Sequence, residues 1–184
     1  MANKPIETYG LHSQKNVWYH NQLDKDDGEI EKKITFVSVM NNTIDYIEEA
    51  VQIATTANYG RKSPDGKPGI LHPLTVGLGG KTDDEIICGL LHNVMEVSDW
   101  TIEKLRARGF SENVLCTLVT LTYDKVTPYM DYVKGIAESG NPTAVAVKLN
   151  DFRHMLVMDR AGGREDLIKK HTEAFEYLQK AAGK

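Results

Sequence analysis

The octet Leu90–Val97 places polar side chains in an apolar run, and these residue types can do chemistry. His92, Asn93 and Glu96 follow soon after the apolar residues Ile86–Cys88. A buried polar group costs free energy unless it has a partner. On a helix, residues four apart share one face, so His92 and Glu96 would lie together. An imidazole is a common metal ligand, and a carboxylate one turn away can accept a proton.

Taken alone, the octet leaves two interpretations open. In the simpler one, His92 is a satisfied core histidine, with an amide beside it and a carboxylate at the edge of the helix. In the other, His92 and Asn93 belong to a site with His72 and Asp151, which the pattern places on separate helices. Two imidazoles with oxygen donors suit Mn²⁺, Fe²⁺ or Zn²⁺. Spacing alone does not show that these residues converge.

Composition indicates one soluble globular domain without a nucleic-acid or membrane partner. The chain has 184 residues, of which 41% are hydrophobic and 26% charged, and its net charge is −4. That length suits a single sizeable core. No dense basic cluster is present to neutralise a phosphate backbone. No apolar run approaches the ~18 residues that a transmembrane helix needs.

Other features favour a cytoplasmic location. The N-terminal residues 1–5 lack the apolar region of a signal peptide. The two cysteines, Cys88 and Cys116, form no C-x-x-C pair. We interpret both as small core residues in a reducing compartment.

Hydrophobic periodicity predicts an all-α domain of roughly seven helices at residues 41–184, preceded by a mostly irregular arm at 1–40. The first helical period begins near Thr43 and ends near Gly60. A basic turn, Arg61–Pro68, comes next. Thr82–Glu85 is a capping box that should begin the helix carrying His92, Asn93 and Glu96. Further starts are indicated by Ser111, Thr127-Pro128 and Asn141-Pro142, and the last of these helices carries Asp151.

Several short segments occur in an order typical of one family. They are Arg61–Ser63 with Gly66–Pro68, Ile70–Leu74, Gly89–Val97, Leu121-Thr122, Tyr129, Tyr132, Asn141–Ala144 and Val147–Asp151. Together they resemble the HD-domain metal-dependent phosphohydrolases, in particular the small guanosine polyphosphate (ppGpp) pyrophosphohydrolases. The resemblance covers about residues 44 to 180, so the first 40 or so residues lie outside it.

This resemblance implies an HD-like helical bundle around one divalent metal, usually Mn²⁺, with Fe²⁺ and Zn²⁺ as alternatives. The implied metal ligands are His72, His92, Asn93 and Asp151. Glu96 matches a carboxylate that helps to activate the attacking water. Arg61 and Lys62 match positions near the nucleotide, although a solvated loop explains them equally well. The implied partner is a nucleotide or another phosphorylated small molecule.

The chain departs from the family pattern at four positions. Asn93 replaces the aspartate of the His-Asp pair, and its amide oxygen can bind a hard cation but carries no charge. Val97 replaces the second carboxylate of a Glu-Asp pair. Met155 stands where Asn is frequent, and Asn58 stands in place of a histidine. Three of these changes lie at or beside the expected metal and water, so they indicate weakened or abandoned chemistry.

Three functional hypotheses follow. The first is a metal-dependent hydrolase of a phosphorylated nucleotide, similar to a (p)ppGpp 3′-pyrophosphohydrolase. The second is a degenerate HD-domain protein that binds a nucleotide or partner without hydrolysis. The third is a structural helical module without a ligand. His154, one turn after Asp151, is a candidate to support the metal ligands, whereas we assign His171 to packing.

Overall fold

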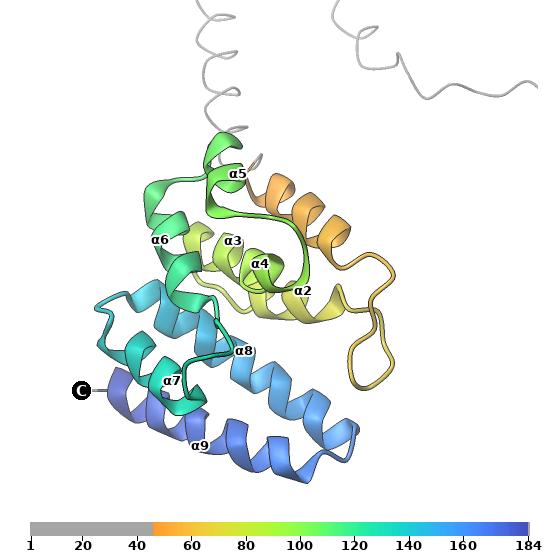
Figure 1. The fold of residues 1–184 in the computed structure, drawn as a ribbon, viewed down its shortest axis with the longest axis vertical. Coiled ribbons are helices and arrows are strands. Elements are labelled where there is room, and N and C mark those ends of the chain that lie inside the picture. The colour runs from red at the N-terminus through yellow and green to blue at the C-terminus, as the bar shows by residue number, and fades with distance from the viewer. Residues whose placement is uncertain (1–45, 184) are drawn as a thin grey trace, which may run out of the picture. The chain divides into compact units, whose positions relative to one another are not determined.

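The computed structural model describes residues 46–183 (Figure 1). The predicted arm at 1–40, its boundary with the domain and the start of the first helix therefore lie outside the described residues. Within 46–183, no helix is both long and apolar enough to cross a bilayer.

Helices make up the described part of the chain, apart from one isolated β-bridge between Lys62 and Pro68. Residues 46–57 are helical. The helices that follow are α2 (Leu71–Leu78), α3 (Asp83–Leu91), α4 (Val94–Val97), α5 (Ile102–Ala107), α6 (Glu112–Leu121), α7 (Tyr129–Glu138), α8 (Pro142–Ala161) and α9 (Glu165–Ala182). The predicted all-α class is confirmed for these residues, and the arrangement is consistent with an HD-like bundle.

At three predicted helix starts, the side chain that predicted the start also caps the helix. Thr82 accepts a hydrogen bond from the Glu85 N–H, and Ser111 and Asn141 cap α6 and α8 in the same way. In a capping box the Glu85 carboxylate would accept from the N–H of Thr82. Here it accepts from the Lys81 N–H instead, at 2.7 Å. Local hydrogen-bonding chemistry therefore fixes these boundaries.

The predicted single helix through His92, Asn93 and Glu96 is wrong, because α3 ends at Leu91 and α4 begins at Val94. The His92 Nδ1 donates to the Gly89 carbonyl at 2.8 Å. In a continuous helix that carbonyl would accept from the N–H of residue 93. The imidazole takes the place of this backbone bond, and Asn93 becomes the residue before α4.

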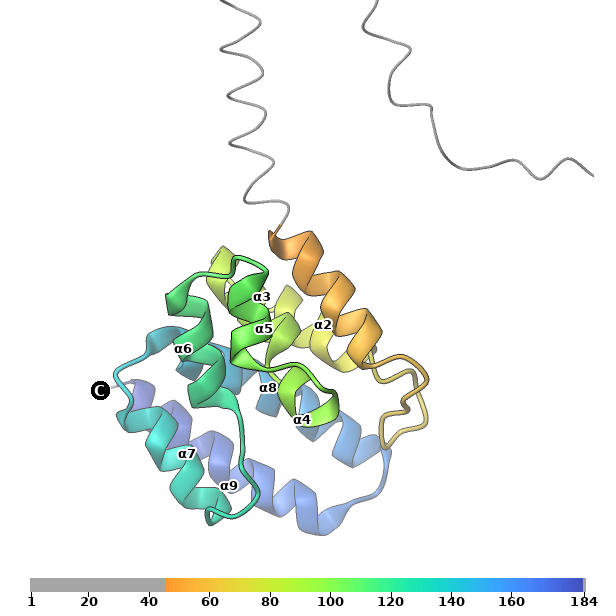
Figure 2. The same cartoon turned by 45° about the horizontal axis from the view of Figure 1, so that its top comes forward.

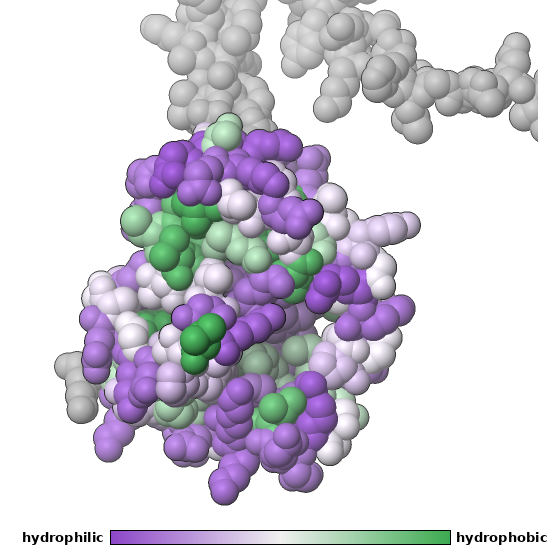
Figure 3. All heavy atoms as spheres, in the orientation of Figure 1, coloured by the Kyte–Doolittle hydropathy of each residue, from purple (hydrophilic) through white to green (hydrophobic). Residues whose placement is uncertain are grey.

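Helix α8 is the central element of the bundle. It packs against α9, α3, α2, α6 and α7, as Figures 1 and 2 show for its long antiparallel contact with α9. Phe152 of α8 and Leu91 of α3 are fully buried between these helices. Cys88 is buried as predicted, but Cys116 is exposed on the outer side of α6. On the face in Figure 3, hydrophilic residues predominate and the apolar patches are small and separate.

Two glycines allow α2 and α3 to approach closely. A Cβ added to Gly89 would lie 2.7 Å from the Cα of Gly77, a distance that real Cβ atoms do not reach. Any side chain at Gly89 would therefore push the two helices apart. This contact sets the spacing of α2, which carries His72, and α3, which leads into His92.

Candidate metal centre and substrate cavity

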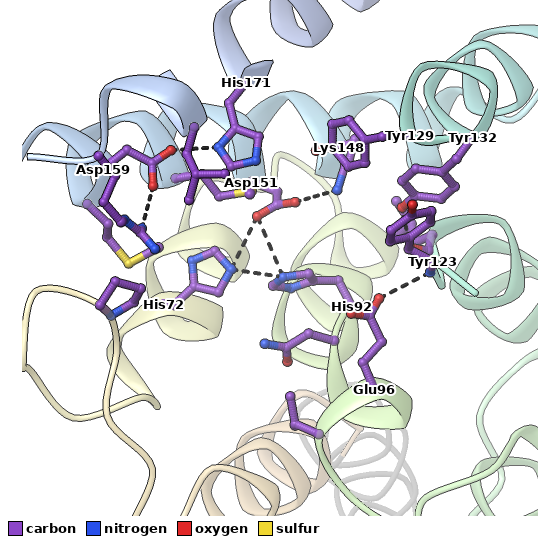
Figure 4. A pocket seen from close by; sticks show the side chains of 18 residues that line it. His72, His92, Glu96, Tyr123, Tyr129, Tyr132, Lys148, Asp151, Asp159 and His171 are labelled. Atoms are coloured by element: carbon purple, nitrogen blue, oxygen red, sulfur yellow. Dashed lines mark hydrogen bonds and ion pairs between the residues drawn. The ribbon is translucent and has the colours of Figure 1, made fainter. Parts of the chain in front are cut away.

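A cavity of about 390 Å³ lies among the helices that carry the predicted site residues (Figure 4). Its wall includes His72 from α2, the α3–α4 junction, Glu96 from α4, and residues of α7, α8 and α9. This size is within the range of small-molecule sites.

Three of the four predicted metal ligands converge at one point of the cavity wall. The Nε2 atoms of His72 and His92 lie 3.0 Å apart. The Asp151 Oδ1 lies 3.2 Å from the first and 3.7 Å from the second. One ligand atom from each residue lies within 4.8 Å of the others. Figure 4 shows both rings and the carboxylate directed toward one point.

Hydrogen bonds on the outer side of the rings orient both imidazoles. The Gly89 carbonyl can only accept, so His92 carries its proton on Nδ1 and has a lone pair on Nε2. The His72 Nδ1 lies 2.9 Å from the His154 Nδ1, and the two rings stack at 5.1 Å. When His72 donates in this contact, its Nε2 also presents a lone pair. His154 thus lies where a residue that orients a ligand is expected.

Burial and charge determine the protonation states of His92 and Asp151. Burial lowers the pKa of His92 to about 4, despite the opposite effect of the Asp151 carboxylate, so the ring is neutral at neutral pH. Burial alone would raise the pKa of Asp151, but the Lys148 ammonium and the two imidazoles hold it well below its usual range. The Lys148 Nζ donates to the Asp151 Oδ2 at 2.7 Å. Asp151 therefore stays ionised, with Oδ1 turned to the histidines.

Asn93 occupies the fourth predicted ligand position without a protein partner. It precedes α4, but its side chain makes no capping bond there and lines the cavity. Its Oδ1 is buried and has no hydrogen-bond partner among the described residues. The same holds for the Asp151 Oδ1. Two unsatisfied oxygen acceptors and two imidazole lone pairs are suitable donors for a divalent cation.

Glu96 lies at the exposed rim of the same cavity. Its Oε1 accepts from the Tyr123 N–H at 3.1 Å, which orients the carboxylate. Desolvation by surrounding atoms raises the pKa of the carboxyl, so it binds a proton more readily than a free glutamate. Val97 lines the cavity beside it and offers no second carboxylate.

The basic turn lies outside the cavity lining. Arg61 and Lys62 are both exposed, and within 61–68 only Pro64 is part of the lining. The Arg61 guanidinium contacts the Val97 carbonyl at 3.5 Å, a weak hydrogen bond that brings the turn next to α4. A substrate-binding role for Arg61 and Lys62 stays a prediction.

The cavity wall also contains polar residues that the sequence did not single out as a site. The His171 Nδ1 donates to the Asp159 Oδ2 at 2.6 Å, and Arg164 forms an ion pair with the Asp159 Oδ1. His171 is buried, as the packing interpretation expected, but it also lines the cavity. The rings of Tyr123, Tyr129 and Tyr132 form one aromatic wall. In the sequence, Asp159 and His171 fall on the faces of two consecutive helices that pack together. That placement is the signal that could have suggested this group.

Comparison with known proteins finds distant relatives. Two are named GTP pyrophosphokinase, from Streptomyces coelicolor (31% identical) and Streptomyces antibioticus (30% identical), each over 155 residues that cover 75% of this chain and 18% of the relative. A third, from Aquifex aeolicus, is named guanosine-3′,5′-bis(diphosphate) 3′-pyrophosphohydrolase. It is 29% identical over 117 residues, 57% of this chain and 16% of the relative.

The chain is a distant relative of these proteins. It spans less than a fifth of their length, since the matches cover 16–18% of each. No family model matches the chain.

Proposed function

We propose that the chain is a metal-dependent hydrolase of a phosphorylated guanosine nucleotide, with an HD-type metal centre. The observation that carries this proposal is the convergence of the His72 Nε2, His92 Nε2 and Asp151 Oδ1 in a buried cavity. The relative named guanosine-3′,5′-bis(diphosphate) 3′-pyrophosphohydrolase supports the choice of substrate. The relatives named GTP pyrophosphokinase support a role in the metabolism of the same nucleotides.

His72, His92, Asn93 and Asp151 would hold the metal, with Mn²⁺ as first choice and Fe²⁺ or Zn²⁺ as alternatives. A bound divalent cation supplies an acidified water and offsets the negative charge of the phosphoryl oxygens. Neutral imidazoles and an ionised carboxylate are the states that bind a cation, and burial and Lys148 favour those states here. Asn93 contributes an oxygen but no charge.

Glu96 would accept the proton of the attacking water. Its raised pKa improves proton uptake at neutral pH, and the Tyr123 N–H fixes one oxygen of the carboxylate. In the hydrolysis, the water oxygen bonds to phosphorus and the bond from phosphorus to the ribose 3′ oxygen breaks. The 3′ oxygen leaves as a hydroxyl after it gains a proton, so the products are pyrophosphate and a 5′-diphosphate.

A second candidate function is nucleotide binding without turnover. Asn93 and Val97 favour it, because each replaces a carboxylate of the family pattern with a neutral side chain. The centre then has a single carboxylate ligand, Asp151, and Lys148 already pairs with it. Lower metal occupancy would reduce hydrolysis in proportion, since phosphoryl transfer depends mainly on positioning and electrostatics.

The first test of the metal centre is a calorimetric titration of Mn²⁺ into chelator-stripped protein. We expect binding that disappears in His72→Ala. Pyrophosphate release from guanosine 3′,5′-bis(diphosphate) is measured next, with Asp151→Ala as the inactive variant. Metal binding without release supports the second candidate, and the double variant Asn93→Asp with Val97→Asp should then gain activity. Absence of binding by Mn²⁺, Fe²⁺ and Zn²⁺ alike would refute the hydrolase proposal.

A further inference from the structure

The Lys148 side chain brings a cation into the wall of the cavity, beside the predicted metal ligands. It lies on α8 one turn before Asp151, and only 10% of the side chain is exposed. The ammonium has three N–H groups, and its hydrogen bond to the Asp151 Oδ2 uses one of them (Figure 4). Lysines are almost never buried without a partner, and the partner here is a carboxylate that we propose as a metal ligand.

The charge of Lys148 also acts on the proposed proton acceptor. Burial raises the pKa of the Glu96 carboxyl, and the Tyr123 N–H and the Lys148 ammonium oppose that shift. The ammonium lies 5.3 Å from the centre of the Tyr132 ring, and an aromatic face attracts a cation without neutralising it. Lys148 therefore stands between Asp151 and Glu96, the groups that would hold the metal and activate the water.

The Tyr129 hydroxyl indicates that a polar ligand fills this part of the cavity. It is buried and has no hydrogen-bond partner among residues 46–183. Burial raises the pKa of this hydroxyl and the Lys148 ammonium opposes the shift, so the charge of Lys148 reaches it. Buried hydroxyls are nearly always satisfied in folded proteins. A free hydroxyl near a cation suits a ligand whose oxygens accept hydrogen bonds.

Metal binding would reverse the net charge of the cavity lining. The charged residues of the lining are Lys148 and Arg164 on one side and Glu96, Asp151 and Asp159 on the other. With the histidines counted as neutral, the net charge is −1, and a divalent cation changes it to +1. The cation would also offset the charge of Asp151, which holds Lys148. A buried ammonium beside a divalent cation is costly unless an anion approaches both.

We propose that the Lys148 ammonium binds an oxygen of a phosphoryl group once the charge of Asp151 is offset. In the metal-free protein, the ammonium is the counter-ion of Asp151. In the metal-loaded protein, its remaining N–H groups donate to the phosphoryl oxygen. The inference rests on the proposed function in one respect: the phosphoryl group is that of the nucleotide substrate. Metal and anion then each strengthen the binding of the other.

Asp151→Asn tests the inference without any metal, because it removes the charge that holds Lys148 and keeps an oxygen acceptor. Orthophosphate is titrated by calorimetry into chelator-treated wild-type and variant proteins, and thermal unfolding confirms that each is folded. We expect Asp151→Asn to bind orthophosphate about tenfold or more tightly than wild type. The double variant Asp151→Asn with Lys148→Met should lose this gain. Absence of the gain, or its persistence in the double variant, would overturn the inference.

Asp131→Asn is the matched control on α7. Asp131 pairs with Lys134 at the same three-residue spacing, but both side chains are exposed. The variant should bind orthophosphate as weakly as wild type, because water screens a lysine at the surface. An equal gain in Asp131→Asn would overturn the inference, since any unpaired lysine would then explain the result.

A metal-loaded arm separates this inference from the proposed function, and it also decides the inference if Asp151→Asn does not fold. In saturating Mn²⁺, Lys148→Met should bind orthophosphate about tenfold or more weakly than wild type. If Lys148 is only a counter-ion of Asp151, the affinity stays unchanged and the inference is overturned. Weaker binding in Lys148→Met without pyrophosphate release by wild type refutes hydrolysis and supports the inference. If no metal binds, the hydrolase is refuted, and the metal-free variants still decide the inference.

A GDP titration of the metal-free variants identifies the source of the phosphoryl group. If GDP gains affinity in Asp151→Asn as orthophosphate does, Lys148 binds a nucleotide phosphate. If orthophosphate alone gains affinity, Lys148 binds the free anion and the nucleotide assignment is overturned.

Discussion

Replacing Lys148 with methionine should destabilise the metal-free protein strongly and should be compensated by metal. The Lys148 side chain is 10% exposed and the Asp151 side chain 4%, and their ion pair measures 2.7 Å. Removing one partner of such a pair leaves a buried, uncompensated charge, which typically costs about 3–5 kcal/mol. For a domain of this size that corresponds to a melting temperature lower by ~10 °C or more.

The control is Lys134→Met, because Lys134 pairs with Asp131 at the same three-residue spacing on α7. That ion pair measures 3.0 Å, but its side chains are 47% and 57% exposed. An exposed pair contributes at most about 1 kcal/mol, so this variant should change the melting temperature little. The two ion pairs have the same charges and the same spacing and differ in burial. The comparison therefore measures the effect of burial on stability.

Thermal unfolding is followed by circular dichroism with chelator and then with Mn²⁺. A cation bound to Asp151 replaces the lost ammonium, and Mn²⁺ at a hundred times its dissociation constant adds about 2.7 kcal/mol. We expect Mn²⁺ to raise the melting temperature of Lys148→Met by several degrees, and by more than that of wild type at the same concentration. Equal losses in the two lysine variants, or no response of Lys148→Met to Mn²⁺, would refute this reasoning.

Two further predictions concern the predicted metal ligands Asn93 and His92. Asn93→Asp should raise the Mn²⁺ affinity about tenfold or more and lower the stability of the metal-free protein, because it adds a charge to a buried oxygen near Asp151. Calorimetry measures the affinity, and the control is Gln52→Glu, which adds the same charge at an exposed position. In the presence of a chelator, the free energy of unfolding should fall by about 3 kcal/mol as the pH drops from 6.5 to about 4. The reason is that the pKa of His92 is lowered by burial, so the unfolded chain binds a proton that the folded one rejects. Melting curves across that pH range should show a shallower slope for His92→Gln, and equal slopes would contradict the assignment.

The helical architecture could be predicted from sequence because its signals are local. Thr82, Ser111 and Asn141 each satisfy backbone donors within three residues, so the chain itself indicates where α3, α6 and α8 begin. The break after Leu91 could not be foreseen in this way. It depends on the His92 ring turning back to the Gly89 carbonyl, and the periodicity of the apolar residues gives no sign of this side-chain bond.

The candidate site was predictable in part. The resemblance to a family pointed to His72, His92, Asn93 and Asp151, and the structure brings three of these together around one point with Asn93 in the same wall. Their role as metal ligands stays a prediction. The sequence analysis missed the contacts of Asp159 with His171 and Arg164, because they join the end of α8 to α9 and to the residue before it. Whether a buried atom lacks a partner is visible only in three dimensions.

If His72 and His92 bind a metal ion as proposed, the close approach of Gly77 and Gly89 limits how the centre would adapt to different ions. His72 and His92 follow the backbones of α2 and α3, which the glycine contact holds at a fixed separation. The two nitrogen donors cannot spread to admit a larger ionic radius unless the bundle itself opens. Adjustment must come from the oxygen donors on Asp151 and Asn93, which stand on other segments. The imidazole pair by itself favours Zn²⁺, so a preference for Mn²⁺ would depend on how many oxygen atoms complete the coordination shell.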